Sequence, residues 1–134
     1  MIEVHIDDDT PELFGKLEKA VSRFIRKSAV HIEGELKSSV AEPKSGNTYP
    51  RGTTAEHTAS APGESPASDS GNFINTLGPP IFETLEAKIG TPLEYPVYLE
   101  DGTENIEPRP LWERTVQEVM PTLEILLAAE VKRL

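Results

Sequence analysis

Residues 41–72 form a tract of 32 positions without a single valine, isoleucine, leucine, methionine or phenylalanine. The tract is rich in serine, threonine, glycine, proline and alanine. Such a composition buries too little apolar surface to offset the entropy of ordering the backbone. The tract is also longer than an ordinary connection inside a compact domain. The sequence therefore predicts an extended arm at 41–72 that does not pack on its own domain and is ordered by neighbouring subunits.

A long amphipathic helix is predicted before this arm. Asp9 or Thr10 is suited to cap it and Pro11 to occupy its first turn. Gly34 weakens the far end, so we expect the helix to end between Ile32 and Ser39. The apolar residues that recur at helical spacing are Leu13, Leu17, Val21, Phe24, Ile25, Ala29, Ile32 and Leu36.

A second amphipathic helix is predicted at the C-terminal end, opening at Pro108–Pro110. Pro121 lies in its interior and removes a backbone hydrogen bond there, so we expect a kink. The apolar stripe consists of Trp112, Val116, Val119, Leu123, Leu126, Leu127 and Val131, with Met120 beside it.

Shorter elements are predicted elsewhere in the chain. Residues 2–6 alternate apolar and polar side chains, which is typical of a strand with one buried face. Residues 73–77 have the spacing of a short helix, capped by Asp69 or Ser70 and ended by residues 78–80. Residues 81–89 alternate as in a strand.

The segment 93–104 is ambiguous. Pro92 and Pro96 disfavour a central strand, while Asp101–Gly102 indicates a turn. We therefore predict one α+β domain over residues 1–134, with two long amphipathic helices packed on a small antiparallel sheet and a long extended arm. Its parts are 1–40, the arm, 73–107 and 108–134.

Composition excludes several classes of function. The chain has no cysteine, hence no disulfide, thiolate metal site or cysteine nucleophile. The net charge of −10 disfavours tight nucleic-acid binding, which depends on lysine and arginine. We find neither a secretory signal nor an apolar run that could span a membrane, so we expect a soluble protein without a membrane partner.

Charge is distributed unevenly along the chain. Residues 1–12 carry five acids and no base, whereas residues 13–37 carry six bases and three acids. The first long helix is thus mildly basic on an acidic body. Two interpretations remain open: a solvated helix face, or a contact with an acidic neighbouring surface.

No arrangement of residues predicts catalysis or a cofactor. His5, His31 and His57 are widely separated and lack the close ligand spacing of a zinc site. Residues 7–9 resemble the start of a calcium loop, but the glycine and glutamate that complete one are absent. Glu100 and Asp101 are interpreted as a surface turn rather than an acid–base pair. We predict no enzyme, no cofactor and no metal ion.

Four motifs together resemble the neck or tail-component family of tailed bacteriophages, the minor proteins of the head–tail junction. They are Ala61–Pro66 with the sequence APGESP, Ser70–Phe73 with SGNF, Tyr95–Thr103 with YPVYLEDGT, and Arg109–Leu111 with RPL. The resemblance covers about residues 49–120.

The resemblance implies a structural role in the virion without catalysis. Many copies would form a ring, six- or twelve-fold, around the channel through which DNA passes without specific binding. Partners would be sister copies, the adjacent head-completion or connector proteins, and tail tube or terminator proteins. The protein would be made in the bacterial cytoplasm and reside in the virion.

Particular residues follow from the arm hypothesis and the resemblance. Candidate inter-subunit arm residues are Tyr49, Pro50, Arg51, Pro62, Gly63, Glu64, Pro66 and Phe73. Structural residues of the family motifs are Gly71, Tyr95, Tyr98, Glu100, Gly102, Thr103, Arg109, Pro110 and Trp112. The alternative hypothesis is a soluble acidic adaptor that binds one partner and has a mobile loop. An enzyme of unrecognised type is a third.

Overall fold

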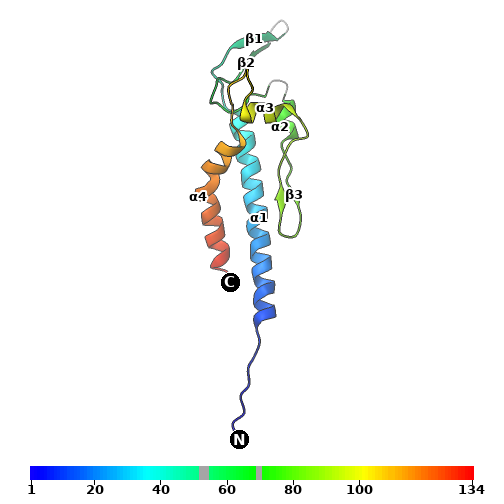
Figure 1. The fold of residues 1–134 in the computed structure, drawn as a ribbon, viewed down its shortest axis with the longest axis vertical. Helices are drawn as coiled ribbons and strands as arrows, with labels where there is room; N and C mark the ends of the chain where they lie inside the picture. The colour runs from blue at the N-terminus through cyan, green and yellow to red at the C-terminus, as the bar shows by residue number, and fades with distance from the viewer. Residues whose placement is uncertain (52–54, 69–70) are drawn as a thin grey trace.

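The computed structural model describes residues 1–51, 55–68 and 71–134. At Arg51 and Ala55 it describes the backbone alone. One helix much longer than the others forms the axis of the molecule (Figure 1). The elements in chain order are α1 (Thr10–Ala41), β1 (Thr48–Arg51), β2 (Ala55–Thr58), α2 (Asn72–Thr76), β3 (Ile81–Phe82), β4 (Ala87–Lys88), α3 (Tyr95–Asp101) and α4 (Trp112–Val131).

This arrangement confirms the predicted α+β class with two long helices and antiparallel strands. The strands form two separate two-stranded sheets, β1–β2 and β3–β4, rather than one sheet. In Figure 1, α4 runs along one side of α1 and the β3–β4 hairpin along the other. The β1–β2 hairpin stands beyond the C-terminal end of α1, and residues 1–9 extend beyond its N-terminal end.

Helix α1 begins where the sequence predicts and ends later. Asp9 is the N-cap residue, as predicted, but its side chain makes no capping hydrogen bond; the backbone N–H of Thr10 donates instead to the carboxylate of the preceding Asp8 at 3.0 Å. The predicted end between Ile32 and Ser39 is wrong, because α1 continues to Ala41. Leu36 and Val40 are buried beyond Gly34, and their burial offsets the cost of about 1 kcal/mol for a helical glycine.

The compact core lies at this C-terminal end of α1. It consists of five buried side chains drawn from α1, α2 and the approach to α4. They are Leu36, Val40, Phe73, Leu77 and Leu111. Ile32, Ile74, Ile89, Leu93 and Trp112 pack around them. The short helix α2 confirms the prediction for residues 73–77; its predicted cap at Asp69 or Ser70 lies outside the described residues.

Helix α4 packs beside the middle of α1 through a thinner interface. Ala20 and Ala29 of α1 and Val119 of α4 are buried there. The Glu130 carboxylate is 1% exposed and accepts hydrogen bonds from Arg23 Nε at 2.8 Å and Lys27 Nζ at 3.0 Å. Those bonds, first from Arg23 and then from Lys27, hold the pKa of Glu130 below its ordinary value.

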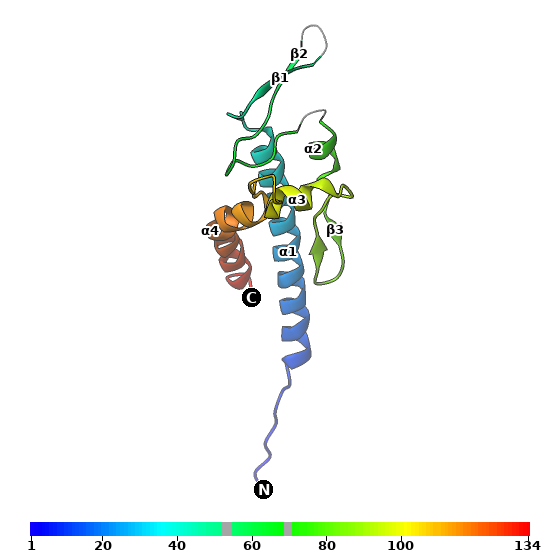
Figure 2. The same cartoon turned by 45° about the horizontal axis from the view of Figure 1, so that its top comes forward.

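The predicted kink in the last helix corresponds to a visible change of direction. Pro121 lies inside α4 and cannot donate to the preceding turn. Figure 2 shows the first turns of α4 running across the view and its last turns running downward. The turn lets the second half of α4 follow α1.

Two predicted strands are wrong. Residues 1–9 form no strand, and Ile2, Val4 and Ile6 are 92%, 76% and 82% exposed, because no other strand lies at that end of the described chain to supply hydrogen bonds. Residues 81–89 form the β3–β4 hairpin instead of one strand. Glu83, the residue out of phase in the alternation, begins its turn and donates its N–H to Glu86 O at 2.8 Å.

Truncation of the core should destabilise the protein strongly. Phe73→Ala removes a ring that is 1% exposed, and we expect a loss of about 3–5 kcal/mol in the free energy of unfolding, measured by urea denaturation. Ile81→Ala, at an exposed position of β3, should change it by less than about 0.5 kcal/mol. Equal effects of the two substitutions would contradict the placement of the core.

Acid should weaken the α1–α4 contact through Glu130. Since its pKa is lower in the folded protein than in the unfolded chain, its stabilising contribution is complete above the ordinary carboxyl range and is lost as the pH falls through the folded pKa. Glu130→Gln should melt at lower temperature than wild type near neutral pH. The difference should shrink on acidification, in thermal melts followed by circular dichroism. Glu124→Gln, exposed on α4, is the matched control.

Candidate functional site

The apolar-free tract divides into a projecting hairpin and a base that is fastened to the body. Strands β1 and β2 pair antiparallel, with Thr48 opposite Thr58 and Tyr49 opposite His57. Backbone hydrogen bonds of 2.9 Å from Gly46 N to Ala59 O and from Ala59 N to Asn47 O close the hairpin at its foot. A side chain at Gly46 would meet Ala59 O at 2.5 Å, so the closure requires glycine.

Glu64 organises the loop that follows the hairpin. Its carboxylate accepts hydrogen bonds from Ser45 N at 3.1 Å, from Ala61 N at 2.8 Å and from the Ser45 hydroxyl. These bonds, led by the one from the Ser45 hydroxyl, lower the pKa of Glu64 to about 2. Glu64, predicted to be an inter-subunit arm residue, thus closes a loop within its own chain.

Lys44 joins the same loop to the end of α1. Its ammonium group donates to Ser39 O and to Ser65 Oγ, both at 2.7 Å, and Ser65 Oγ donates to Ser39 O at 2.7 Å. Burial is the main cause that lowers the pKa of Lys44. Ser60, Ser65 and Pro66 are buried. The expectation that the whole tract cannot pack on its own domain is therefore wrong for residues 59–68, where hydrogen bonds replace apolar burial.

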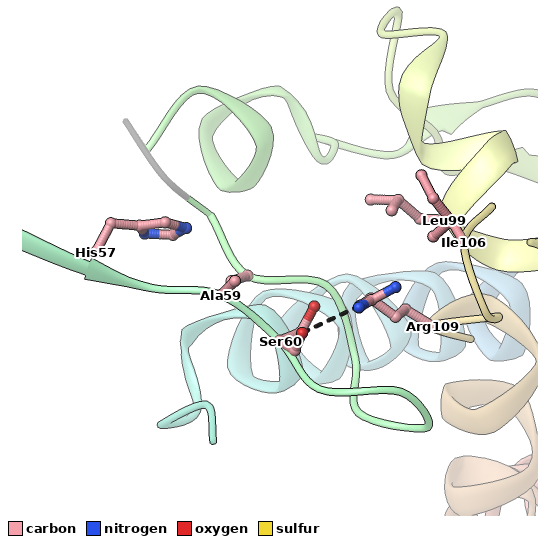
Figure 3. Close-up of a pocket in the computed structure, with 7 residues that line it drawn as sticks. His57, Ala59, Ser60, Leu99, Ile106 and Arg109 are labelled. Carbon is pink, nitrogen blue, oxygen red and sulfur yellow. Dashed lines mark hydrogen bonds between the residues drawn. The ribbon is translucent and has the colours of Figure 1, made fainter. Parts of the chain in front are cut away.

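Arg109 connects this loop to the segment between α3 and α4. Its Nε donates to Ser60 O at 3.1 Å, its Nη1 to Glu107 O at 3.0 Å, and its backbone N to Leu99 O at 2.6 Å. Nearby, Gly63 N donates to Pro108 O at 3.2 Å, and Arg114 Nη2 donates to Gly63 O. In Figure 3 the Arg109 side chain points toward Ser60 beneath Leu99 and Ile106.

A shallow pocket lies at this junction, with a volume of ≈ 280 Å³. Figure 3 shows His57 reaching it from β2 and Arg109 from the opposite side. Its lining residues are His57, Ala59, Ser60, Ala67, Leu99, Ile106 and Arg109. The guanidinium of Arg109 donates hydrogen bonds to backbone carbonyls, so the positive charge at this pocket stabilises the loop rather than marking a ligand site.

Glu100 caps α4 from a distance in the sequence. Its carboxylate accepts hydrogen bonds from the backbone N–H groups of Leu111 at 2.7 Å, Trp112 at 3.1 Å and Glu113 at 3.0 Å. These are donors that a helix start leaves without an intrahelical partner, at the positive end of the helix dipole. The interpretation of Glu100 as part of a surface turn is wrong: residues 95–101 form α3, which presents Glu100 to α4.

Two glycines of the motifs fix sharp changes of direction. Gly102 ends α3 with φ +77°, and a side chain there would meet Ile106 O at 2.8 Å. Thr103 then pairs with Ile106 through a 2.8 Å backbone bond from Thr103 N. Gly71 precedes α2, also with φ +77°, and its carbonyl accepts from Asn75 N at 3.0 Å.

The remaining predicted residues divide between core and surface. Phe73 is buried and contacts Tyr95 edge-on with ring centroids 5.6 Å apart, so its assignment to the inter-subunit arm is wrong. Trp112 and Pro110 are half-buried, and Tyr98 is exposed. Tyr49 and Pro50 are exposed on β1, and Pro62 and Gly63 are exposed in the loop. The side chain of Arg51 lies outside the described residues.

The geometry of the histidines gives no common site. His5 lies in the N-terminal segment, 3.0 Å from Asp7, while His31 is on α1 and His57 on β2. Within residues 1–51, 55–68 and 71–134, no three histidine, aspartate or glutamate side chains gather closely enough to hold a metal ion. Over the same residues, no helix has both the length and the apolar character needed to cross a membrane.

Sequence reasoning missed an open apolar groove along α1. It has a volume of ≈ 360 Å³ and lies between the β3–β4 hairpin and α4. Its apolar lining residues are Phe24, Ile25, Ala29 and Ile32 from α1, Leu85, Ala87 and Ile89 from the hairpin, and Leu123 from α4. Leu13, Phe14 and Leu17 on α1 and Val116, Met120, Leu127 and Val131 on α4 are also exposed.

The sequence could have indicated this surface, because the apolar stripes of the two long helices differ in length. At ~1.5 Å per residue, α1 is about 48 Å long and α4 about 30 Å. The apolar stripe of α1 begins at Leu13, beyond the reach of a shorter antiparallel partner that starts at the other end. A comparison of the two stripes therefore indicates unpartnered apolar surface.

Comparison of the chain with protein-family models, with curated proteins and with solved structures found no match.

Removal of the Glu100 carboxylate should loosen the start of α4. Glu100→Ala leaves the N–H groups of Leu111, Trp112 and Glu113 without this acceptor, and we expect a loss of about 1–2 kcal/mol in unfolding free energy. Hydrogen exchange should rise first at these three amides. Glu104→Ala, in the exposed turn nearby, is the control. Unchanged exchange at Leu111–Glu113 in Glu100→Ala would contradict the capping role.

Proposed function

We propose that the protein is a non-enzymatic structural component of a tailed-bacteriophage virion, assembled as a homo-oligomeric ring around the DNA channel at the head–tail junction. The phage assignment rests on the resemblance of residues 49–120 to the neck or tail-component family. The assignment to a ring rests on the apolar surface that the single chain leaves exposed. No residue is assigned a catalytic role.

The observation that carries the proposal is the amount of apolar surface that the single chain leaves uncovered. Exposed apolar residues continue beyond the groove toward the N-terminal end of α1, among them Leu13 and Leu17 on α1 and Leu127 and Val131 on the antiparallel α4. Large exposed apolar surfaces on soluble chains mark sites of protein association. A protein that functions in an assembly would cover them with its neighbours.

Two further features favour a ring over a closed pair. The hairpin, the groove and the opposite side of α1 are different surfaces, as head-to-tail contacts require, and such contacts close into rings when their rotation permits. The net charge of −10 suits a channel through which DNA slides, because phosphates find few cations to bind. A six- or twelve-fold ring is the expectation from the resemblance, and its neighbours would be head-completion and tail proteins.

The alternative function is an acidic adaptor that binds one partner and has a mobile loop. The projection of β1–β2 beyond the body favours it (Figure 1). Limited proteolysis separates the two proposals. Cleavage within 48–58 in both the isolated and the assembled protein supports the adaptor, whereas protection on assembly supports the ring.

Removal of the hairpin tests whether it contacts a neighbour in the ring. Because Gly46 and Asn47 already bond to Ala59, residues 48–58 can be replaced by an Asn-Gly turn without disturbing the base. We expect wild type to assemble with a defined copy number and the deletion variant to remain smaller, measured by size-exclusion chromatography with light scattering.

Two results would count against the proposal. Wild-type protein that stays monomeric at every concentration would contradict the ring. A deletion variant that forms the full ring would show that the hairpin is not an inter-subunit arm. Tyr49→Ala, exposed on β1, is a milder variant that keeps the hairpin's backbone pairing and should weaken assembly in the same direction.

A further inference from the structure

The outer edge of β4 has no partner strand among the described residues, since β4 pairs with β3 on its other side. The backbone N–H of Glu83 donates to Glu86 O at 2.8 Å. Because hydrogen-bonded pairs alternate along an antiparallel ladder, the next such pair is Ile81 with Lys88. The N–H and C=O groups of Ala87 therefore point away from β3. An open strand edge of this kind can pair with an extended segment of another chain.

This edge borders the apolar groove on α1. The hairpin lines the groove from its turn and its β4 side, through Leu85, Glu86, Ala87 and Ile89. Strand β3 lies farther round α1, where the Phe82 ring packs on the Arg26 guanidinium at 4.7 Å. A third strand beside β4 would therefore lie over the floor of the groove, between the hairpin and Leu123 of α4.

Residues 2–6 have the pattern and the length that suit this site. Ile2, Val4 and Ile6 share one face of an extended chain, and all three are exposed. At ~3.4 Å per residue they span about 14 Å. The groove runs from Phe24 to Ile32 of α1, about 12 Å at ~1.5 Å per residue. One apolar face of β-branched side chains thus matches the groove in length.

An antiparallel register places apolar residues opposite one another on the groove side. With Val4 opposite Ala87, the two residues can exchange backbone hydrogen bonds, because the groups of Ala87 face outward. The pairs that face α1 are then Ile2 with Ile89, Val4 with Ala87, and Ile6 with Leu85. Leu85 is 52% exposed in the single chain, and the added strand would cover it.

The same register brings complementary side chains together on the solvent side. Glu3 lies opposite Lys88, and His5 lies opposite Glu86. Lys88 Nζ is 3.6 Å from Glu86 and 3.8 Å from Glu83, beyond hydrogen-bond distance, and its side chain is 61% exposed, so it is open to a further carboxylate. A parallel strand with Val4 opposite Ala87 would instead set the carboxylates of Glu3 and Glu86 against each other. Charge therefore selects the antiparallel direction.

The segment cannot reach this position on its own chain. Ile89 packs against the core cluster, in which Leu36 is 26 residues into α1 from Thr10, or about 39 Å along the helix axis. Ile2 is eight residues before Thr10, a span of at most about 28 Å when fully extended. Figure 1 shows residues 1–9 leading away from the body. The strand beside β4 must therefore come from another copy.

We propose that residues 2–6 of one copy add as an antiparallel strand to the outer edge of β4 of the neighbouring copy, with Val4 opposite Ala87. This inference rests on the proposed ring and names one of its contacts. The segment and the groove are different surfaces, so the contact is head-to-tail, as a ring requires. Backbone hydrogen bonds to β4 set the register, and Ile2, Val4 and Ile6 fill the groove.

Cysteine cross-linking tests the register directly, because the natural chain has no cysteine. Glu3 and Lys88 form a non-hydrogen-bonded pair in this register, with Cα atoms about 4.5 Å apart, within the range of a disulfide. Full-length Glu3→Cys and Lys88→Cys chains, one carrying a mass tag, are mixed under assembly conditions, oxidised and analysed on non-reducing gels. The expected product is a linked dimer containing one chain of each kind. The matched control pairs Glu3→Cys with Glu86→Cys, which are opposite only in the parallel register and should give no such product.

Proline substitution provides a second measurement that does not depend on thiols. Val4→Pro removes the N–H that donates to β4, whereas His5→Pro removes one that faces solvent in the proposed register. Both positions lie outside every described helix and strand, so the melting temperature of the single chain should not change. Val4→Pro should raise the concentration at half-assembly, measured by light scattering, by about tenfold or more. His5→Pro should assemble nearly as wild type does.

The outcomes separate this contact from the ring itself. A ring without the link between residues 3 and 88, or with the link between residues 3 and 86 in its place, overturns the proposed contact and leaves the proposed function standing. Equal effects of Val4→Pro and His5→Pro on assembly also overturn it. Wild-type protein that never assembles overturns both.

Discussion

The fold depends on the packing of Leu36 and Val40, in the last turns of α1, against Phe73, Leu77 and Leu111. These five side chains bring together α1, α2 and the start of α4. The compact core of a 32-residue helix is thus confined to one end. Elsewhere α1 is held by the Glu130 ion pairs and by small buried side chains such as Ala20 and Ala29. The consequence is a helix with two long sides open to association.

Beyond the C-terminal end of α1, hydrogen bonds rather than apolar burial hold the chain in place. Residues 41–68 cannot exclude water with aliphatic side chains, yet Glu64, Lys44 and Arg109 satisfy a set of backbone groups that the loops leave unpaired. Each of these charged groups has more than one partner, which gives the loop one arrangement rather than many. The hairpin is consequently presented on a fixed base, with Thr48, Tyr49 and Pro50 of β1 exposed.

Periodicity predicted the two long helices, the short helix at 73–77 and the α+β class, because those elements depend on local spacing and on buried aliphatic residues. The strand at 2–6 was wrong because alternation records which side chains can share a face and says nothing about whether a partner strand exists. The end of α1 was wrong because the burial of Leu36 and Val40 outweighs the local penalty of Gly34. Glu100 could not be assigned as a cap from sequence, since its partners at 111–113 are reached only through the fold.

Four residues of the motifs fix the course of the backbone or tie segments together. Gly71 and Gly102 set backbone direction, Glu100 caps α4, and Arg109 ties α3 to the loop at Ser60. Glu100, Gly102 and Arg109 lie together at the junction from which the hairpin projects, whereas Gly71 belongs to the start of α2. The resemblance therefore bears on how this junction is constructed.

The surfaces that would join copies lie largely outside the motif region. The exposed Leu13, Phe14 and Leu17 of α1 precede residue 49, and the exposed Leu127 and Val131 of α4 follow residue 120. A substitution at Leu13 or Leu127 would change these surfaces without touching the hydrogen bonds that hold the hairpin. Copy number and neighbours would then be set by the open sides of α1 rather than by the motifs.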